Sequence, residues 1–332
     1  MKFGELVQPI IDGREMTCEQ AAALMSYLIG GEATDAQIGA VIVGLRVKGC
    51  TAGELAEFVR VMRAHAESVE HPFDDLVDTC GTGGGNPTFN ISTAAAIVAA
   101  AAGARIAKHG NRSMTGLGSA DVLEQLGVPV VTDRAALIEK LEKVKIAFLF
   151  APAHHPAMRH VAKARKELGV RTVFNQLGPL SNPAGARRQL IGVYDETLLH
   201  AMAQALAKLG CERAMLVHGL DGLDEVSPCA PTEAVELRDG GLTSFTLAPA
   251  DFGLEPLPET AIATGNDLSE NAKILKEAIG DCTSLRSQAI LPSAACALYV
   301  AGLVRDLKEG VASASETIRT GAALAKLEEM KA

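Results

Sequence analysis

The segment at residues 78–85 (DTCGTGGG) has the composition of a loop that binds an anion. It is followed by Asn90-Ile91-Ser92-Thr93, where a helix is predicted to begin. Glycines let a backbone approach a phosphate closely, and a helix N-terminus offers it free N–H groups. The spacing matches neither a P-loop nor the dinucleotide pattern G-x-G-x-x-G. The segment indicates a phosphate site of another kind, with a tight turn and an ordinary Ser/Thr cap as the alternative.

A second polar segment, 108–113 (KHGNRS), places two cations, an imidazole and an amide within five residues. Lysine and arginine side chains of this kind bind phosphate and carboxylate groups. Taken alone, the segment is equally compatible with a polar surface loop. Because it and the glycine loop each follow a predicted strand, the two together favour an anion site.

Asp224 and Glu225 form an adjacent pair of carboxylates after the predicted strand that ends near residue 217. Mg²⁺ prefers a few carboxylate oxygens and completes its shell with water and substrate phosphates. Acids in a solvated loop are the commoner reading of such a pair. Its position near the predicted phosphate site favours a magnesium site.

His154 and His155 precede a predicted helix that carries Arg165. Adjacent histidines rarely bind one metal ion together, so one of them is interpreted as a stacking or hydrogen-bonding wall. Arg165 on its helix face suits two parallel hydrogen bonds to a substrate carboxylate. A surface salt bridge is the alternative for this arginine.

A mostly parallel sheet must position these segments. Short apolar runs at 76–78, 105–107, 146–150, 190–194 and 214–217 alternate with helical patterns, which predicts an α/β fold with helices on both faces. Residues 233–246 predict an antiparallel hairpin. Since ligands bind beyond the carboxyl ends of parallel strands, the polar segments are expected at one edge of the sheet.

Helices are predicted at both ends of the chain. Capping-box patterns at Thr17, Thr34 and Thr51 each precede apolar residues at helical spacing, which predicts a small helical unit within the first 66 residues. Its apolar faces require a partner, either the rest of the chain or a second subunit. The last 65 residues also have helical patterns, with Pro292 expected near the start of one helix.

Composition limits the classes of protein that the chain can belong to. The 332 residues are 48% hydrophobic and 21% charged, which suits a globular protein of about two domains. The net charge of −9 argues against a general nucleic-acid binder. The longest small apolar run, 94–104, is too short to cross a bilayer, and no secretory signal is recognised. Seven scattered cysteines without a C-x-x-C pair indicate reduced thiols in a cytoplasmic protein.

Six segments together resemble, in order, the motifs of the anthranilate phosphoribosyltransferase family. They are Gly81–Gly84, Asn90–Thr93, Lys108–Arg112, His155–Met158, Gly178–Pro183 and Asp224-Glu225. The resemblance implies a Mg²⁺-dependent pentosyltransferase of tryptophan biosynthesis. Such an enzyme moves the phosphoribosyl group of phosphoribosyl pyrophosphate to the amine of anthranilate and releases pyrophosphate.

The resemblance also implies a domain organisation. A small all-helical domain, residues 1–70 plus about 157–185, would contact anthranilate and form a homodimer. A large α/β domain, residues 71–156 and 186–332, would hold phosphoribosyl pyrophosphate and Mg²⁺. Neither a nucleic acid nor a membrane is expected as a partner.

Residue roles follow from the same resemblance. The substrate-binding set would be Gly81, Thr82, Gly84, Asn90, Ser92, Thr93, Lys108, His109, Asn111, Ser119, His155 and Arg165. The metal ligands would be Ser92, Asp224 and Glu225. Lys108, Asn111 and Arg165 would contribute most to catalysis, and Arg165 would meet the carboxylate of anthranilate.

Two loops depart from the family pattern. Gly85-Asn86-Pro87 is one residue shorter than the usual segment and lacks its Asp, and 113–119 is also one residue shorter and lacks a Ser-Ser pair. Both changes fall in the pyrophosphate and metal region, so a catalytically weak paralogue is one alternative. A pyrimidine nucleoside phosphorylase-like enzyme, which works without the metal pair, is a second. A non-catalytic nucleic-acid-binding relative is a third.

Overall fold

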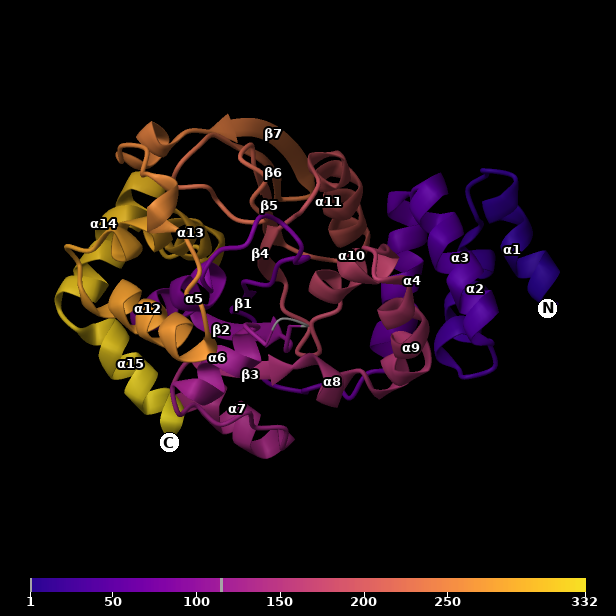
Figure 1. Cartoon of the computed structure of the whole chain (residues 1–332), viewed down its shortest axis with the longest axis horizontal. Helices are drawn as coiled ribbons and strands as arrows, with labels where there is room; N and C mark the ends of the chain where they lie inside the picture. Colours follow the sequence, from indigo (N-terminus) through magenta and orange to yellow (C-terminus); the bar gives the residue numbers. More distant parts are fainter. Residues whose placement is uncertain (1, 114–115) are drawn as a thin grey trace.

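A seven-stranded sheet forms the centre of the computed structural model, which describes residues 2–113 and 116–332 (Figure 1). The strands are β1 (Leu76–Asp78), β2 (Arg105–Gly110), β3 (Ile146–Phe150), β4 (Arg188–Gly192), β5 (Arg213–Gly219), β6 (Thr232–Arg238) and β7 (Gly241–Leu247). Their order across the sheet is β3-β2-β1-β4-β5-β6-β7. The first five run parallel, while β6 and β7 are antiparallel. The predicted fold class is confirmed.

Helices cover both faces of this sheet and form a separate lobe beside it. The N-terminal helices are α1 (Phe3–Ile11), α2 (Cys18–Ile29), α3 (Asp35–Lys48) and α4 (Ala52–Ala64). The middle of the chain contributes α5 (Ile91–Ala101), α6 (Ser119–Gln125), α7 (Arg134–Lys143), α8 (Ala151–His154), α9 (Arg159–Leu168), α10 (Val173–Leu180) and α11 (Leu199–Lys208). The C-terminal helices are α12 (Leu268–Gly280), α13 (Leu285–Ala301), α14 (Leu307–Arg319) and α15 (Ala322–Lys331).

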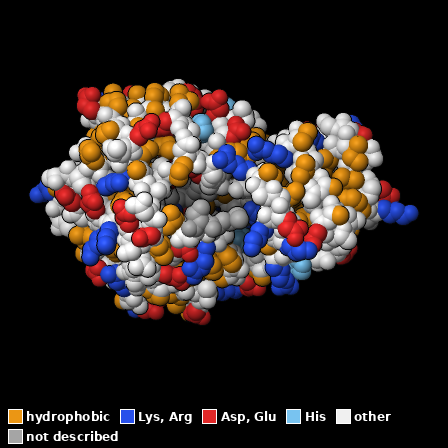
Figure 2. All heavy atoms as spheres, in the orientation of Figure 1, with side chains coloured by type: hydrophobic (Ala, Val, Ile, Leu, Met, Phe, Trp, Pro, Cys, Tyr) orange, Lys and Arg blue, Asp and Glu red, His pale blue; other side chains and the backbone are white. Residues whose placement is uncertain are grey.

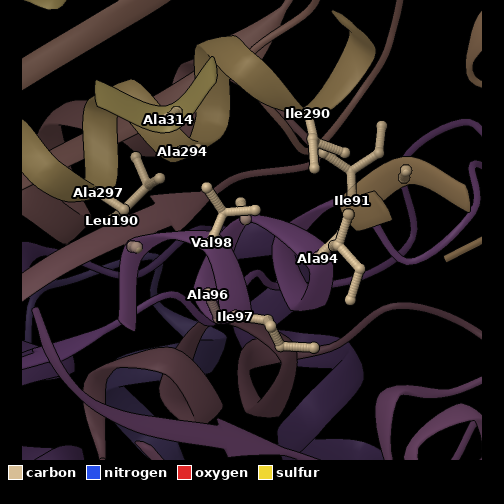
Figure 3. Close-up of a cluster of buried hydrophobic side chains, with 14 of the residues drawn as sticks. Ile91, Ala94, Ala96, Ile97, Val98, Leu190, Ile290, Ala294, Ala297 and Ala314 are labelled. Carbon is tan, nitrogen blue, oxygen red and sulfur yellow. The ribbon is translucent and has the colours of Figure 1, made fainter. Parts of the chain in front are cut away.

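One face of the sheet packs against α5 and the C-terminal helices. Figure 3 shows Val98 of α5, Leu190 of β4 and Ala294 of α13 within one cluster of buried side chains. Gly310 of α14 lies so close to α13 that an added Cβ would be 2.9 Å from the Cα of Ala295. Small residues therefore let these helices approach each other closely, which positions the N-terminus of α5 firmly at the edge of the sheet.

Helices α7 and α11 cover the opposite face of the sheet. Helix α7 packs on β2 and β3 through Leu137 and Leu141. Helix α11 packs on β5 and β6, and it also contacts α4 of the N-terminal lobe. One continuous core joins α1–α4, α9 and α10 to α11 and to the inner side of β4–β6. The apolar faces of the N-terminal helices thus find much of their partner within the chain.

The three predicted capping boxes are present, because Thr17, Thr34 and Thr51 each accept a bond from the backbone three residues on. The prediction for Pro292, however, is wrong: this proline is the eighth residue of α13 rather than near the start of a helix. The dense packing of α13 against α5 and α14 holds the helix together across the hydrogen bond that a proline removes. Among the described residues no helix combines the length and the apolarity needed to cross a membrane.

Candidate active site

A large cavity opens where the strand order reverses, between β1 and β4. Loops after these two strands diverge to opposite sides, which leaves a crevice at the carboxyl edge of the sheet. Thr82 ties the loops together there: its N–H donates to the Gly192 carbonyl oxygen over 2.8 Å, and its Oγ1 accepts the Tyr194 N–H over 3.0 Å. The cavity has a volume of about 740 Å³.

Thirteen of the fourteen residues predicted for the site line this one cavity. They are Gly81, Thr82, Gly84, Asn90, Ser92, Thr93, Lys108, His109, Asn111, Ser119, Arg165, Asp224 and Glu225. The fourteenth, His155, lines a smaller cavity of about 320 Å³ next to it. His109, Asn111 and Arg165 line both cavities, so the two are continuous. Segments that lie far apart along the chain are therefore brought together in one place.

The glycine loop packs directly on the acid pair. A Cβ at Gly85 would lie 2.4 Å from Oδ1 of Asp224, so this position has no room for a side chain. The backbone N–H groups of Gly85 and Gly83 stabilise the ionised Asp224. The shortened loop, which lacks the family's Asp, thus closes over the carboxylate. In the second shortened loop, residues 114–115 lie outside the described part of the chain.

Lys108 and the N-terminus of α5 meet at the floor of the cavity. Lys108 is 3% exposed, and its Nζ donates to the Thr79 carbonyl oxygen over 2.7 Å and lies 3.5 Å from Oγ of Ser92. The Ser92 N–H donates to Oε1 of Glu225 over 3.1 Å. A cation, a hydroxyl, a carboxylate and the positive end of a helix dipole therefore face one small volume.

Burial dominates the electrostatics of the acid pair. It raises the pKa of Glu225 to about 7, and the neighbouring charge of Asp224 adds to the effect. Burial also raises the pKa of Asp224, although backbone N–H groups and the charge of Arg171 oppose the shift. Two half-buried carboxylates whose ionised forms are under-compensated are suited to a divalent cation, and Ser92 supplies a third oxygen beside them. The donor set fits Mg²⁺.

Neutral histidines form the opposite wall. The rings of His109 and His155 lie 5.3 Å apart between centroids. Burial lowers the pKa of His109 to about 3 and that of His155 to about 4, so both imidazoles are uncharged at neutral pH. Among the described residues, Nε2 of His155 and Oγ1 of Thr93 are buried without a hydrogen-bond partner. These groups are available to a ligand in the cavity.

Arg165 reaches the cavities from α9, across from the strand ends. Its guanidinium lies 5.1 Å from the ring centre of Phe174, which lines both cavities as well. Burial lowers the pKa of Arg165, but a guanidinium remains charged throughout the physiological range. Figure 2 shows the molecule hollowed at its centre, with Lys and Arg side chains gathered where the smaller lobe meets the larger body. An aromatic acid could thus meet a cation and an aromatic ring together.

Arg171 and Asn175 were not assigned a role from the sequence. A Cβ at Gly84, whose φ is +92°, would lie 2.5 Å from Nε of Arg171, and the guanidinium stacks 4.6 Å from the Tyr194 ring centre. Asn175 donates from Nδ2 to the Thr82 carbonyl oxygen over 3.5 Å. Both residues follow α9 and support the glycine loop from the other lobe. Both belong to the segment 171–175 (RTVFN), which contains polar residues, but nothing in the sequence showed which loop these residues would contact.

Comparison with known proteins agrees with this geometry. Family models described as "Glycosyl transferase family, helical bundle domain" and "Glycosyl transferase family, a/b domain" match residues 4–66 and 73–324. An anthranilate phosphoribosyltransferase of Myxococcus xanthus is 46% identical over 331 residues, which are 98% of this chain and 97% of that relative.

Solved structures lead to the same family. Anthranilate phosphoribosyltransferase from Thermus thermophilus superposes with a TM-score of 0.92 at 40% identity, covering 98% of both chains. The Saccharomyces cerevisiae enzyme, solved in complex with PRPP and Mg, has a TM-score of 0.88 at 30% identity and covers 99% of this chain and 96% of its own. Sequence and structure together show that the chain belongs to the anthranilate phosphoribosyltransferase family.

Proposed function

We propose that the chain transfers the phosphoribosyl group of phosphoribosyl pyrophosphate to the amine of anthranilate, with release of pyrophosphate, in tryptophan biosynthesis. One observation carries the proposal. A single cavity joins Lys108, Ser92 and the acid pair on one side to Arg165 on the other. The two sides suit the two halves of the reaction, a pyrophosphate with its metal and an aromatic acid. The nucleoside phosphorylase-like alternative does not account for an acid pair that lines the cavity.

The pyrophosphate would bind at the floor of the cavity. Lys108 and the positive end of the α5 helix dipole would face the charge that grows on the leaving group, which is where electrostatic stabilisation is most effective. Asp224, Glu225 and Ser92 would hold Mg²⁺, and a bound Mg²⁺ would supply neutralisation of the pyrophosphate charge. Oγ1 of Thr93, buried without a partner among the described residues, would hydrogen-bond to the same substrate.

Anthranilate would bind against the opposite wall. Arg165 would hold its carboxylate through two parallel hydrogen bonds, while Phe174 and the two neutral histidines would flank its ring. An aryl amine is already uncharged at neutral pH, so attack on the anomeric carbon needs no strong general base. Asn111, which lines both cavities, would orient the amine between the two substrates. Positioning of this kind can contribute about 7–11 kcal/mol.

The assembly, domain and location proposals rest on separate features. Ile11, Val43 and Val47 on α1 and α3 are 68%, 41% and 83% exposed, and apolar side chains are visible on the surface of this lobe (Figure 2). We propose that residues 1–70 and about 157–185 form the dimerising domain, with 71–156 and 186–332 as the catalytic one. All seven cysteines are free, which suits the cytoplasm.

The decisive assay mixes the protein with Mg²⁺, phosphoribosyl pyrophosphate and anthranilate and follows the loss of anthranilate fluorescence. Anthranilate is expected to be consumed only when the protein, Mg²⁺ and phosphoribosyl pyrophosphate are all present. A folded sample that leaves anthranilate unconsumed would contradict the proposal.

For the dimer, sedimentation equilibrium of Val47→Glu should show monomers. Leu220→Glu, which changes a 50% exposed leucine on the large domain, should leave the dimer intact.

A further inference from the structure

Three arginines lie in register across the sheet at the edge opposite the active site. Arg188 at the start of β4 pairs directly with Arg213 at the start of β5, and Arg213 pairs with Arg238 at the end of β6. Directly opposite residues of neighbouring strands project to the same face of a sheet. These three residues, the arginine row, therefore face the same side of the sheet, at the opposite ends of β4 and β5 from Gly192 and Gly219.

The arginine row is electrostatically under-compensated. Like charges directly opposite each other destabilise a sheet. The Glu212 carboxylate lies 3.0 Å from the Arg187 guanidinium and 3.8 Å from the Arg188 guanidinium. Its negative charge is therefore divided between these two arginines. Asp239 lies 3.7 Å from Nε of Arg238, but its side chain is 94% exposed and its charge is screened by water. Over residues 2–113 and 116–332, Arg213 has no carboxylate partner, and its Nε is buried without a hydrogen bond.

Contacts with Tyr299 and with the end of α13 fix the guanidiniums without neutralising them. The Arg213 guanidinium stacks 4.4 Å from the ring centre of Tyr299, whose hydroxyl lies 3.3 Å from Nη1 of Arg238. Nη1 of Arg188 donates to the Ala301 carbonyl oxygen over 2.6 Å, at the C-terminus of α13. The negative end of that helix dipole is equivalent to about half a charge, which offsets only part of one arginine.

Space for a ligand is present between these groups. The row, Glu212, Asp239, Ala301 and Gly302 line a cavity of about 490 Å³. Gly302 ends α13 with a φ of +79°, and a Cβ at this position would lie 3.4 Å from Nη1 of Arg213. A glycine here both ends the helix and leaves the cavity open beside the unpaired guanidinium.

We propose that the arginine row binds a small polyvalent oxyanion, such as a phosphate-bearing or polycarboxylate metabolite, at a site separate from the catalytic cavity. Planar guanidiniums held by an aromatic ring and a carbonyl offer paired N–H donors to such an anion. A bound oxyanion would bridge three cations that otherwise repel each other. The proposal does not depend on the reaction that the other edge of the sheet performs.

The test counts bound anions. Equilibrium dialysis with radiolabelled inorganic phosphate, at ionic strength fixed with chloride, compares the whole chain with Arg213→Gln and Arg105→Gln. Arg105 is the matched control, because it sits at the start of β2, stacks on Phe73 and is already paired with Asp75 at 2.9 Å. The number of phosphates bound per chain should fall by one in Arg213→Gln and stay unchanged in Arg105→Gln. Any phosphate held at the active site is common to all three proteins.

A second variant guards against misfolding. Arg238→Gln changes a half-exposed member of the row, should keep full transferase activity and should weaken phosphate binding at this site at least about tenfold. Citrate that displaces the phosphate would assign the site to polyvalent oxyanions in general, and citrate that does not would assign it to phosphate. Equal stoichiometry and affinity in all variants, with a lower melting temperature for Arg238→Gln, would show that the arginines serve the fold alone and would overturn the proposal.

Discussion

The two sides of the catalytic cavity differ in how far their polar groups are already paired. On the phosphate side, the Ser92 N–H donates to Glu225 and Lys108 donates to the Thr79 carbonyl oxygen, and Oγ1 of Thr93 is the exception without a partner among the described residues. On the acceptor side, the two histidines are neutral, Nε2 of His155 has no hydrogen-bond partner among the described residues, and the Arg165 guanidinium packs against the Phe174 ring. A side that is already networked can receive charge with little rearrangement. A side with unpaired groups is completed by its ligand, so the two sides should respond differently to substitution.

The phosphate side should give the largest effect. Lys108→Ala removes a buried cation that, in the proposed function, faces the pyrophosphate, so we expect kcat/KM for phosphoribosyl pyrophosphate to fall ~100- to 1,000-fold. Steady-state kinetics with each substrate varied in turn measures the change. Circular dichroism must first show that the variant is folded, because Lys108 also holds the Thr79 carbonyl. Unchanged kinetics would remove Lys108 from the proposed role.

Substitution of the acid pair tests the metal. Glu225→Gln keeps the shape of the side chain and removes its charge, so half-maximal activity should require about 10- to 100-fold more Mg²⁺. Titration of activity with Mg²⁺ provides the measurement. Glu196→Gln, a change in an exposed acid that follows β4, is the control and should leave the requirement unaltered. An identical requirement in all three proteins would rule out Glu225 as a ligand.

The acceptor side should show a change confined to one substrate. Arg165→Met keeps the length of the side chain and removes its charge, and the KM for anthranilate should rise about tenfold while that for phosphoribosyl pyrophosphate stays near its original value. Lys166→Met, on the exposed side of the same helix, should change neither. If both KM values rose equally, the distinction between the two sides would fail.

The smallest effect is a pH dependence of stability. The buried His109 has a pKa of about 3, below its ordinary value of 6.5, so the unfolded chain takes up more protons as the pH falls. Between pH 7 and pH 6 the wild type should therefore lose about 0.7 kcal/mol more unfolding free energy than His109→Asn. Asp78, whose pKa burial raises to about 6, acts oppositely in both proteins and largely cancels. Urea unfolding at pH 7 and pH 6 measures the unfolding free energy of both proteins. Equal losses of unfolding free energy in the wild type and in His109→Asn would contradict the burial argument.

Much of the site was predictable because strand ends are local features of the sequence. The glycine loop, the KHGNRS segment and the acid pair each follow a predicted strand, and parallel strands bring such ends to one edge. The contact of Arg171 with Gly84 was not predictable, since it joins two loops through the packing of separate lobes. The arginine row was equally hidden: its register depends on how β4, β5 and β6 align, and periodicity within each strand does not determine that alignment.

The central claim is that both substrates meet across one cavity at the reversal of strand order. A crystal structure with Mg²⁺, phosphoribosyl pyrophosphate and an unreactive anthranilate analogue tests it most directly. The account predicts the pyrophosphate between Lys108 and the N-terminus of α5, the metal at Asp224 and Glu225, and the analogue's carboxylate on Arg165. Phosphates bound away from Lys108, or an analogue carboxylate that does not touch Arg165, would contradict it.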